Sequence, residues 1–277
     1  MAAPDARIAG DGAGIVRRPA TVSASARHPG GAQWRRDASM NVGTHIDTSF
    51  DEDLGALRGS VMEMGDLAAR MVGDAGQLLS VHDAALADQM LEADRRLDGL
   101  RDAVEARAVS IIARRQPVAD DLRLVVASMR IAGALERVGD LAKNIAKRSA
   151  ALEGAGGPRD AALAARRMAE RARTSLLDAM QAFRAGDLAT ADAVWRGDAD
   201  LDGMLNSLFR ELLTYMAENP RAISQGAHLL FCGKNIERIG DHATTIAESV
   251  HFIETGQPLE GERPKIDSVF PEPPQSA

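Results

Sequence analysis

Apolar residues recur at steps of three or four along the segment from about Asp51 to Ser80, which is the spacing of one face of an α-helix. The stripe consists of Leu54, Leu57, Val61, Met64, Ala68, Met71, Ala75 and Leu78. Runs rich in Val, Ile, Thr and Tyr, which are typical of strands, do not appear. The pattern therefore predicts an all-α protein.

Aspartates and prolines divide the rest of the chain into further helices. Asp83 and Asp187 are suited to cap helix N-termini, because an aspartate oxygen accepts hydrogen bonds from free backbone N–H groups. The helices that follow must stop before Pro117 and Pro220, since proline lacks a donor and clashes with the preceding turn. The expected helices after the first cover about 84–115, 119–150, 159–184, 188–217 and 221–254.

The chain contains two copies of one unit. The pentad "ERVGD" begins at Glu136, and "ERIGD" begins at Glu237, 101 residues later; "DRRLDGL" (94–100) matches "DADLDGM" (198–204), 104 residues later. Short connections between long amphipathic helices make neighbours antiparallel. We therefore expect two tandem antiparallel three-helix bundles, with six long helices, over residues 45–152 and 153–254.

The two ends of the chain lack helical periodicity. Residues 1–44 are rich in Ala, Gly, Arg and Ser, and residues 255–277 are rich in proline, so both are expected to be disordered. Met40 is a candidate for the true start. No apolar run approaches the roughly 20 residues that span a bilayer, and no signal-peptide core follows the early arginines, so we expect a soluble, cytoplasmic protein.

Composition narrows the classes of partner. The net charge of −7 and the pI of about 5.4 argue against nucleic acid, because phosphate binding relies on clustered Lys and Arg. The single cysteine, Cys232, cannot form an internal disulfide, which fits a reducing compartment, and we expect it to pack as a small hydrophobe. An acidic protein of this kind is suited to cations.

Each copy carries two pairs of acidic residues four positions apart, a spacing that places both on one helix face. The pairs are Asp94 and Asp98, Glu136 and Asp140, Asp198 and Asp202, and Glu237 and Asp241. The midpoint of residues 98 and 136 is Pro117, and the midpoint of residues 202 and 237 lies beside Pro220. An antiparallel hairpin folded at each proline should bring the four acids of that copy together.

Such a cluster needs a cation or must take up protons. At an effective dielectric constant near 20, two carboxylates 5 Å apart repel each other by about 3 kcal/mol. Carboxylate oxygens without thiolates suit Mg²⁺, Mn²⁺ or iron, and Zn²⁺ as a further candidate, with two ions per bundle as an upper number. Asn144, one turn beyond Asp140, is a further candidate ligand, although capping or a surface role explains it equally well.

The position on each helix refines this hypothesis. Glu136 and Asp140 continue an apolar stripe and should face a neighbouring helix, whereas Asp94 and Asp98 should lie at the edge of the core. A glycine inside a helix costs about 1 kcal/mol relative to alanine. Gly139 and Gly240, within the pentads, should therefore serve a close approach by a ligand or a neighbouring backbone.

Simpler interpretations compete with a metal site. A single acidic pair on a helix is usually solvated surface, and Arg137 and Arg238 are expected to form ion pairs near the acids. His242 is expected to be structural.

A carboxylate-bridged di-metal enzyme of the ferritin-like type uses two Glu-x-x-His motifs. One such motif, Glu248 to His251, occurs here, but the equivalent segment of the first copy is "KRSA" (147–150). The metalloenzyme remains the alternative hypothesis.

Three stretches resemble the PhoU family of bacterial phosphate-signalling proteins over about residues 46–255. They are "TSFDEDLGALRGSVMEMGDLAARM", "RQPVADDLRLVVASMRIAGALERVGDLAKNIAKR" and "NIERIGDHATTIAE". The resemblance implies tandem three-helix bundles whose E/D-x-x-x-D motifs bind multinuclear metal clusters. It also implies a non-enzymatic, typically dimeric regulator that represses the phosphate-starvation response by communicating between the ATP-binding subunit of the phosphate ABC transporter and a membrane sensor histidine kinase.

Carried over to this sequence, the family's metal motif falls on acids at all eight positions: Asp94, Asp98, Glu136, Asp140, Asp198, Asp202, Glu237 and Asp241. Two features depart from the family pattern. Thr245 stands where the second copy usually has an asparagine, as the first copy does at Asn144, and the second turn, "ENPRAISQG", differs from the "RQPVADDLR" form. We therefore expect the second site to bind metal differently.

Overall fold

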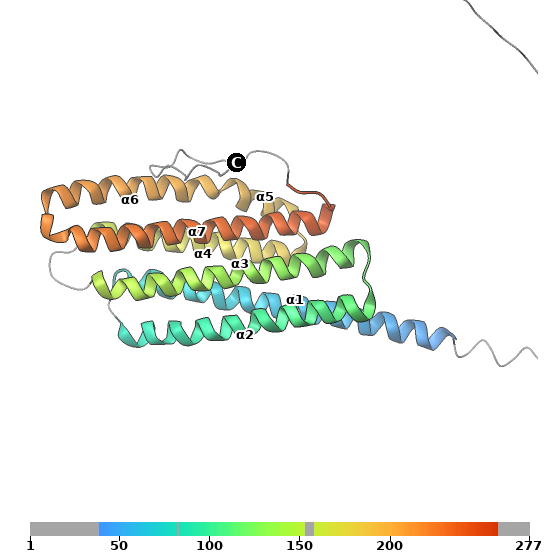
Figure 1. The fold of residues 1–277 in the computed structure, drawn as a ribbon. Coiled ribbons are helices and arrows are strands. Elements are labelled where there is room, and N and C mark those ends of the chain that lie inside the picture. The colour runs from blue at the N-terminus through green and yellow to red at the C-terminus, as the bar shows by residue number, and fades with distance from the viewer. Residues whose placement is uncertain (1–38, 82, 153–157, 260–277) are drawn as a thin grey trace, which may run out of the picture. The chain divides into compact units, whose positions relative to one another are not determined.

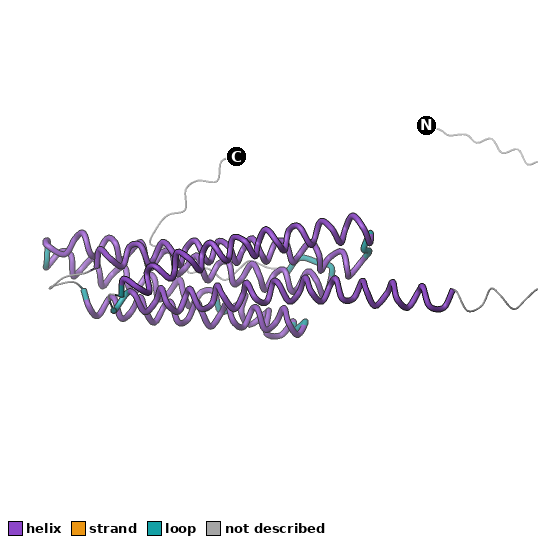
Figure 2. The backbone as a smooth tube through the Cα atoms, turned by 90° about the horizontal axis from the view of Figure 1, so that it is seen from below, coloured by secondary structure: helices purple, strands orange, loops and turns teal. Residues whose placement is uncertain are grey.

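The described chain consists of α-helices joined by short connections (Figure 2), in a computed structural model that describes residues 39–81, 83–152 and 158–259. The helices are α1 (Ser39–Leu78), α2 (Ala84–Arg115), α3 (Ala119–Ser149), α4 (Arg159–Ala185), α5 (Leu188–Arg196), α6 (Asp198–Glu218) and α7 (Ile223–Thr255). Short 3₁₀ turns, Ala150–Leu152 and Pro220–Ala222, follow α3 and precede α7. None of the described helices combines the length and the apolar composition that a bilayer-spanning helix requires.

The expected caps and proline turns set the helix boundaries. Asp83 Oδ1 accepts a hydrogen bond from the Leu86 N–H at 3.0 Å, and Asp187 Oδ1 accepts one from the Ala189 N–H at 2.9 Å. At the first hairpin, Gln116 takes a left-handed conformation (φ 50°) that ends α2 immediately before Pro117. The all-α prediction and the limits predicted for α2 are confirmed, and α3, α4 and α7 begin and end within two residues of their predicted limits.

The second helix of the second copy is not continuous, as we had expected for residues 188–217. It is divided at Gly197 into α5 and α6. Arg171, on α4, donates hydrogen bonds to the Gly197 carbonyl oxygen at 3.4 Å and to Asp200 Oδ2 at 3.0 Å. Because glycine is a poor helix former and Arg171 offers its backbone another partner, the helix restarts at Asp198.

The ends also differ from expectation where the structure describes them. Residues 39–44, which we expected to be disordered, belong to α1. Extending an existing helix by a few residues is easy once its first turn has formed, even for a sequence without apolar periodicity. Residues 1–38, the linker residues 153–157, and the tail from residue 260 lie outside the described residues.

The helices of the two copies pack side by side. In the first copy α2 packs along α3, and in the second copy α7 contacts α4, α5 and α6. The third helices of the two copies, α3 and α7, lie beside each other between α2 at the lower edge and α6 at the upper edge of Figure 1. Buried residues of both copies belong to one hydrophobic cluster. The duplicated halves therefore share a core.

Polar and aromatic contacts reinforce the seam between α3 and α7. Arg123, near the start of α3, donates from Nε to the Ile253 carbonyl oxygen at 3.1 Å, close to the C-terminus of α7. The Arg148 guanidinium lies 4.7 Å from the ring centre of Phe231, a cation–π contact. Cys232, beside Phe231, is fully buried as expected, and burial raises the pKa of its thiol to about 12 despite the opposing charge of Arg148.

Gly139 and Gly240 are places where two helices meet closely. A β-carbon on Gly139 would overlap Cδ2 of Leu97, and a β-carbon on Gly240 would overlap Cδ1 of Leu201. Leu97 and Leu201 are equivalent residues of the two copies, and each is 1% exposed. A close approach exists at both glycines, but a leucine side chain of the preceding helix makes it, and not the ligand or neighbouring backbone that we expected.

We expect Gly139→Ala and Gly240→Ala each to destabilise the protein by about 1 kcal/mol. Overpacking a full core typically costs 1–3 kcal/mol, which outweighs the roughly 1 kcal/mol gained in helix propensity. Gly133→Ala, on α3, is the matched control, because nothing lies within 4 Å of the added carbon. Urea unfolding followed by circular dichroism should show a gain in stability for the control alone. Equal gains for all three variants would contradict this explanation.

Candidate functional site

The first acidic cluster consists of Asp94 and Asp98 on α2 and Glu136 and Asp140 on α3. Lys143 joins the two helices there, because its Nζ donates to Asp94 Oδ2 and to Asp140 Oδ1, each at 2.6 Å. The hairpin at Pro117 thus brings the two helices level, as the sequence predicts. Asp94 is 8% exposed, so it lies within the core and not at its edge, where we had expected it.

Lys143 is itself largely enclosed, with its side chain 18% exposed. Burial lowers the pKa of its ammonium group, but the hydrogen bonds that it donates to Asp140 and Asp94, and the charges of these two acids, outweigh burial and hold the pKa above the ordinary value. The ammonium is therefore a permanent positive charge between two carboxylates. A buried ion pair of this kind requires both partners, since removal of one leaves the other charge without compensation.

The remaining residues of the first cluster are less tightly held. Arg137 lies 3.6 Å from Glu136 and 3.7 Å from Asp140, in the surface ion pairs we expected for it. Asp98 and Asn144 are exposed and make no hydrogen bond or ion pair with the part of the chain that the structure describes. The contacts therefore bring Asp94 and Asp140 together around a lysine, and leave Asp98 and Asn144 facing solvent.

The second acidic cluster consists of Asp198 and Asp202 on α6 and Glu237 and Asp241 on α7. Asp198 is the first residue of α6 and is 6% exposed. The buried hydroxyl of Thr244 lies 3.3 Å from Asp198 Oδ1 and 3.2 Å from the Gly240 carbonyl oxygen, as a donor to either. The two helices are again level, with the glycine of the pentad at the contact.

Glu237 is the most unusual acid of the second cluster. Lys234 Nζ donates to its Oε1 at 2.8 Å, but its Oε2 is buried without a hydrogen-bond partner. Burial raises the pKa of Glu237, and the charges of Asp241 and Asp202 raise it further, while Lys234 opposes the shift. The negative charges of Asp241 and Asp202 therefore act on Glu237.

The two clusters differ in how one of their carboxylates is paired. No three Asp, Glu, His or Cys side chains within residues 39–259, the gaps excepted, are gathered tightly enough to hold one ion, so the acids of neither cluster form a metal site in this arrangement. At the second cluster, the partnerless Oε2 of Glu237 is a ready ligand. At the first cluster, the Lys143 ammonium lies between Asp94 and Asp140 and pairs with both carboxylates.

Sequence reasoning missed three residues of these clusters: Lys143, Thr244 and Lys234. Each has a positional signal. Lys143 lies three residues after Asp140, and Lys234 lies three residues before Glu237, spacings at which opposite charges meet on a helix. Thr244 occupies the position in the second pentad segment that Lys143 occupies in the first.

The lone Glu-x-x-His motif takes no part in either cluster. His251 Nδ1 lies 3.1 Å from the Gln257 carbonyl oxygen and 3.3 Å from Thr255 Oγ1, at the C-terminus of α7. These contacts explain His251 as part of the helix end.

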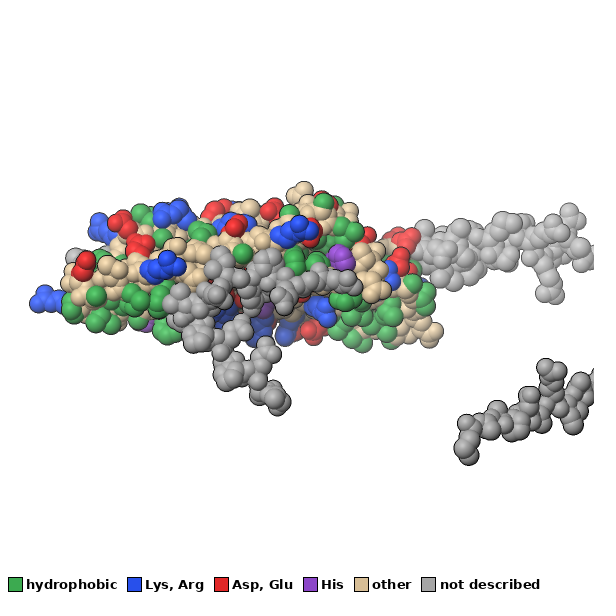
Figure 3. Space-filling model, turned by 90° about the horizontal axis from the view of Figure 1, so that it is seen from above, with side chains coloured by type: hydrophobic (Ala, Val, Ile, Leu, Met, Phe, Trp, Pro, Cys, Tyr) green, Lys and Arg blue, Asp and Glu red, His purple; other side chains and the backbone are tan. Residues whose placement is uncertain are grey.

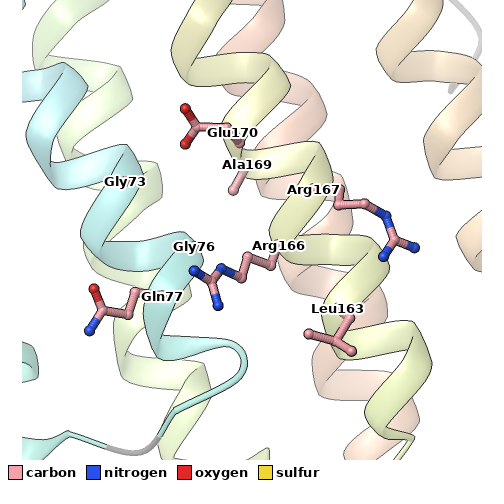
Figure 4. A pocket seen from close by; sticks show the side chains of 8 residues that line it. All are labelled: Gly73, Gly76, Gln77, Leu163, Arg166, Arg167, Ala169 and Glu170. Carbon is pink, nitrogen blue, oxygen red and sulfur yellow. The ribbon is translucent and has the colours of Figure 1, made fainter.

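A groove of about 460 Å³ separates α1 from α4 at another place in the fold (Figure 4). Arg166 extends from α4 into the space between the two helices, and its Nη1 donates to Ser80 Oγ at 3.2 Å. Arg167 points away, and Gly73 and Gly76 form the α1 wall. None of the eight acids lines this groove, so it is distinct from both acidic clusters.

Comparison with known proteins places the repeat in a family. The family model for the PhoU domain matches residues 61–149 and again residues 165–250. Each match contains the pentad of one copy; the first includes all of α3, and the second includes α7 as far as residue 250.

Two relatives match this chain over almost their own full length. The phosphate-specific transport system accessory protein PhoU homolog of Rhizobium meliloti (strain 1021) is 46% identical over 223 residues, which is 80% of this chain and 94% of that protein. A protein of the same name from Caulobacter vibrioides (strain NA1000 / CB15N) is 43% identical over 223 residues, or 80% of this chain and 97% of that protein.

Solved structures agree in fold. The crystal structure of PhoU from Pseudomonas aeruginosa matches with a TM-score of 0.72 and 34% identity, over 75% of this chain and all of that one. The phosphate transport system regulatory protein PhoU from Streptococcus pneumoniae matches with a TM-score of 0.71 and 25% identity, over 76% of this chain and 99% of that one. With its two matched repeats and its helical bundles, the chain belongs to the PhoU family.

Proposed function

We propose that this protein is a non-enzymatic regulator of phosphate uptake that represses the phosphate regulon when phosphate is plentiful. The observation that carries the proposal is the match to relatives over at least 94% of their length, because those relatives are called accessory proteins of the phosphate-specific transport system. In this proposal the protein, as a cytoplasmic homodimer, contacts the ATP-binding subunit of the transporter and a sensor histidine kinase.

The eight acids are the proposed ligands of the metal ions. Bound cations would neutralise the carboxylates of each cluster and tie α2 to α3 and α6 to α7. Glu237 supports this role, because its buried Oε2 lacks a partner and Asp202 and Asp241 add repulsion. The metal would thus be structural, with Mg²⁺, Mn²⁺, iron or Zn²⁺ compatible with the carboxylate ligands.

The first hairpin offers a surface for a protein partner. Val118, Leu122 and Val126 recur every four residues at the start of α3 and are 74%, 39% and 46% exposed. Val109 and Ile112, on the α2 side of the same turn, are also exposed. Large apolar side chains gathered on a surface mark sites of protein association. We propose that this apolar hairpin surface contacts the transporter or the kinase.

Charge is mixed on the face of the molecule that Figure 3 shows. On the face shown in Figure 3, Lys and Arg side chains are interspersed with Asp and Glu side chains and with hydrophobic groups. A mixed surface favours protein partners over the phosphate backbone of nucleic acid, which selects clustered positive charge.

Deleting the gene should leave phosphate-starvation genes expressed in high phosphate, because the repressing contact is lost. A reporter fused to a phosphate-regulated promoter measures this, and the wild-type gene supplied in trans should restore repression.

Purified protein should also retain the ATP-binding subunit and the cytoplasmic part of the kinase in a pull-down. Normal repression without the gene, or protein that binds neither partner and instead turns over a substrate, would favour the metalloenzyme.

Leu122→Asp combined with Val126→Asp should abolish this pull-down and repression, because two charges would enter the apolar hairpin surface. Leu177→Asp is the matched control, since Leu177 is similarly exposed (36%) but lies on α4. Both proteins should keep the helical circular dichroism spectrum of the wild type. If the control fails equally, or if the double variant represses normally, the contact lies elsewhere.

Metal should raise the midpoint temperature of unfolding, because it relieves repulsion in the folded state only. Ligand present at 100 times its Kd adds about 2.7 kcal/mol to the free energy of unfolding. Calorimetry on protein loaded with Mn²⁺, and on the same sample stripped with a chelator, measures the difference. An unchanged midpoint temperature in a sample shown to start loaded would refute the linkage.

A further inference from the structure

The third helices of the two copies have equivalent buried faces. Positions of α3 and α7 that lie equally far from the glutamate of their pentads are 101 residues apart in the chain. Most buried positions of the two helices match by this offset. Examples are Val125 and Gly226, Ile131 and Cys232, Leu135 and Ile236, and Ile145 and Ile246. Because equivalent positions face the core, equivalent positions also face away from it.

Apolar side chains occupy the outer face at the start of both helices. Leu122 and Val126, of the apolar hairpin surface, have Ile223 and Ala227 as their equivalents. Phe231 continues the stripe on α7 one turn later, and Ile223 and Phe231 are 51% and 57% exposed. We call the stripe of Ile223, the half-buried Ala227 and Phe231 the α7 apolar surface. Each repeat thus exposes apolar residues at the start of its third helix.

The α7 apolar surface has the composition of a protein-binding site. The Arg148 guanidinium lies 4.7 Å from the ring centre of Phe231 and holds that exposed ring in place. Aromatic residues and arginine are both enriched where proteins associate. The equivalent of Phe231 on α3 is Arg130, so the second copy has gained an exposed aromatic ring at this position.

The two apolar surfaces lie at opposite ends of an antiparallel helix pair (Figure 1). Arg123, near the start of α3, contacts Ile253, near the end of α7, whereas Arg148, near the end of α3, contacts Phe231. Antiparallel neighbours with equivalent faces are related by an approximate two-fold axis normal to the plane of the pair, so both surfaces face the same side. Arg148 follows Val126 by 22 residues. At 1.5 Å per residue, the two surfaces lie roughly 33 Å apart.

Each surface alone is small for a stable complex. An exposed apolar patch on a typical monomer covers about 300–600 Å², whereas each partner in a stable complex buries ~800 Å². Two linked contacts that form together raise the overall affinity by about 10²–10⁴-fold over one contact. Two equivalent surfaces on one side of the molecule therefore suit a partner that is itself two-fold symmetric.

We propose that α3 and α7 form one docking face, on which the apolar hairpin surface and the α7 apolar surface each contact one of the paired ATP-binding subunits of the phosphate transporter. The inference rests on the proposed function. Because that proposal is carried by similarity to accessory proteins of a transport system, the transporter is the paired partner. The internal repeat then has a task, since its two-fold symmetry matches that of the partner.

The experiment titrates fluorescently labelled full-length protein with the intact, detergent-solubilised transporter and follows the anisotropy. Ile223→Asp combined with Phe231→Asp should weaken binding by about a hundredfold or more, because one of two linked contacts is lost. Leu122→Asp combined with Val126→Asp should weaken it equally. Leu177→Asp, on α4 and outside both surfaces, is the matched control and should bind like wild type. All variants should keep the helical circular dichroism spectrum.

The isolated ATP-binding subunit tests the number of contacts, because a single subunit gains nothing from linkage. Sedimentation at saturating subunit concentration should show two subunits bound per wild-type chain and one per chain of either double variant. The variant that combines all four substitutions should bind none.

The outcomes separate this inference from the proposed function. Transporter binding at wild-type strength by the Ile223→Asp and Phe231→Asp variant, or one subunit per wild-type chain, would overturn the second contact while leaving the proposed function intact. A loss of binding confined to the cytoplasmic part of the kinase would overturn the choice of the transporter. Wild-type protein that binds neither the transporter nor the isolated subunit would refute the proposed contact with the transporter as well.

Discussion

Like-charge repulsion between carboxylates is the constraint around which each half of this protein is arranged. The pentad places two acids one helical turn apart, and the facing helix brings two more to the same level. Because Gly139 and Gly240 have no side chain, the facing helix can pack closely against the pentad. Leu97 fills the space at Gly139, and Leu201 fills the space at Gly240, where a β-carbon would overlap them. In the first copy this packing holds Asp94 and Asp140 near one another, and the Lys143 ammonium between them compensates their charges.

Much of the fold follows from local signals in the sequence. Helix boundaries predicted from residues that act on the neighbouring backbone are close to those observed. These residues are the N-caps Asp83 and Asp187 and the prolines Pro117 and Pro220. The division at Gly197 depends on Arg171 of a different helix, which no local pattern indicates. The prediction of disorder for residues 39–44 is wrong because a helix can extend beyond its apolar stripe, which periodicity does not indicate.

The candidate site was predictable in its positions but not in its contacts. Duplication and hairpin symmetry identify the eight acids, because both arguments need only residue spacing. Neither tells Asp94, which is buried, from Asp98, which is exposed. Nor do they indicate the course of the Lys143 side chain, since a lysine at that spacing can equally extend into water. Its conformation is decided by burial and by the facing helix, which are tertiary effects.

The seam between α3 and α7 has a consequence for how the molecule comes apart. Arg123 ties the start of one copy's third helix to the end of the other's, and Arg148 stacks on Phe231 farther along. Neither copy can lose its third helix without exposing core residues of the other. A chain built from two repeats should therefore unfold in a single cooperative transition, with backbone amides of α3 and α7 among the last to exchange with deuterated water.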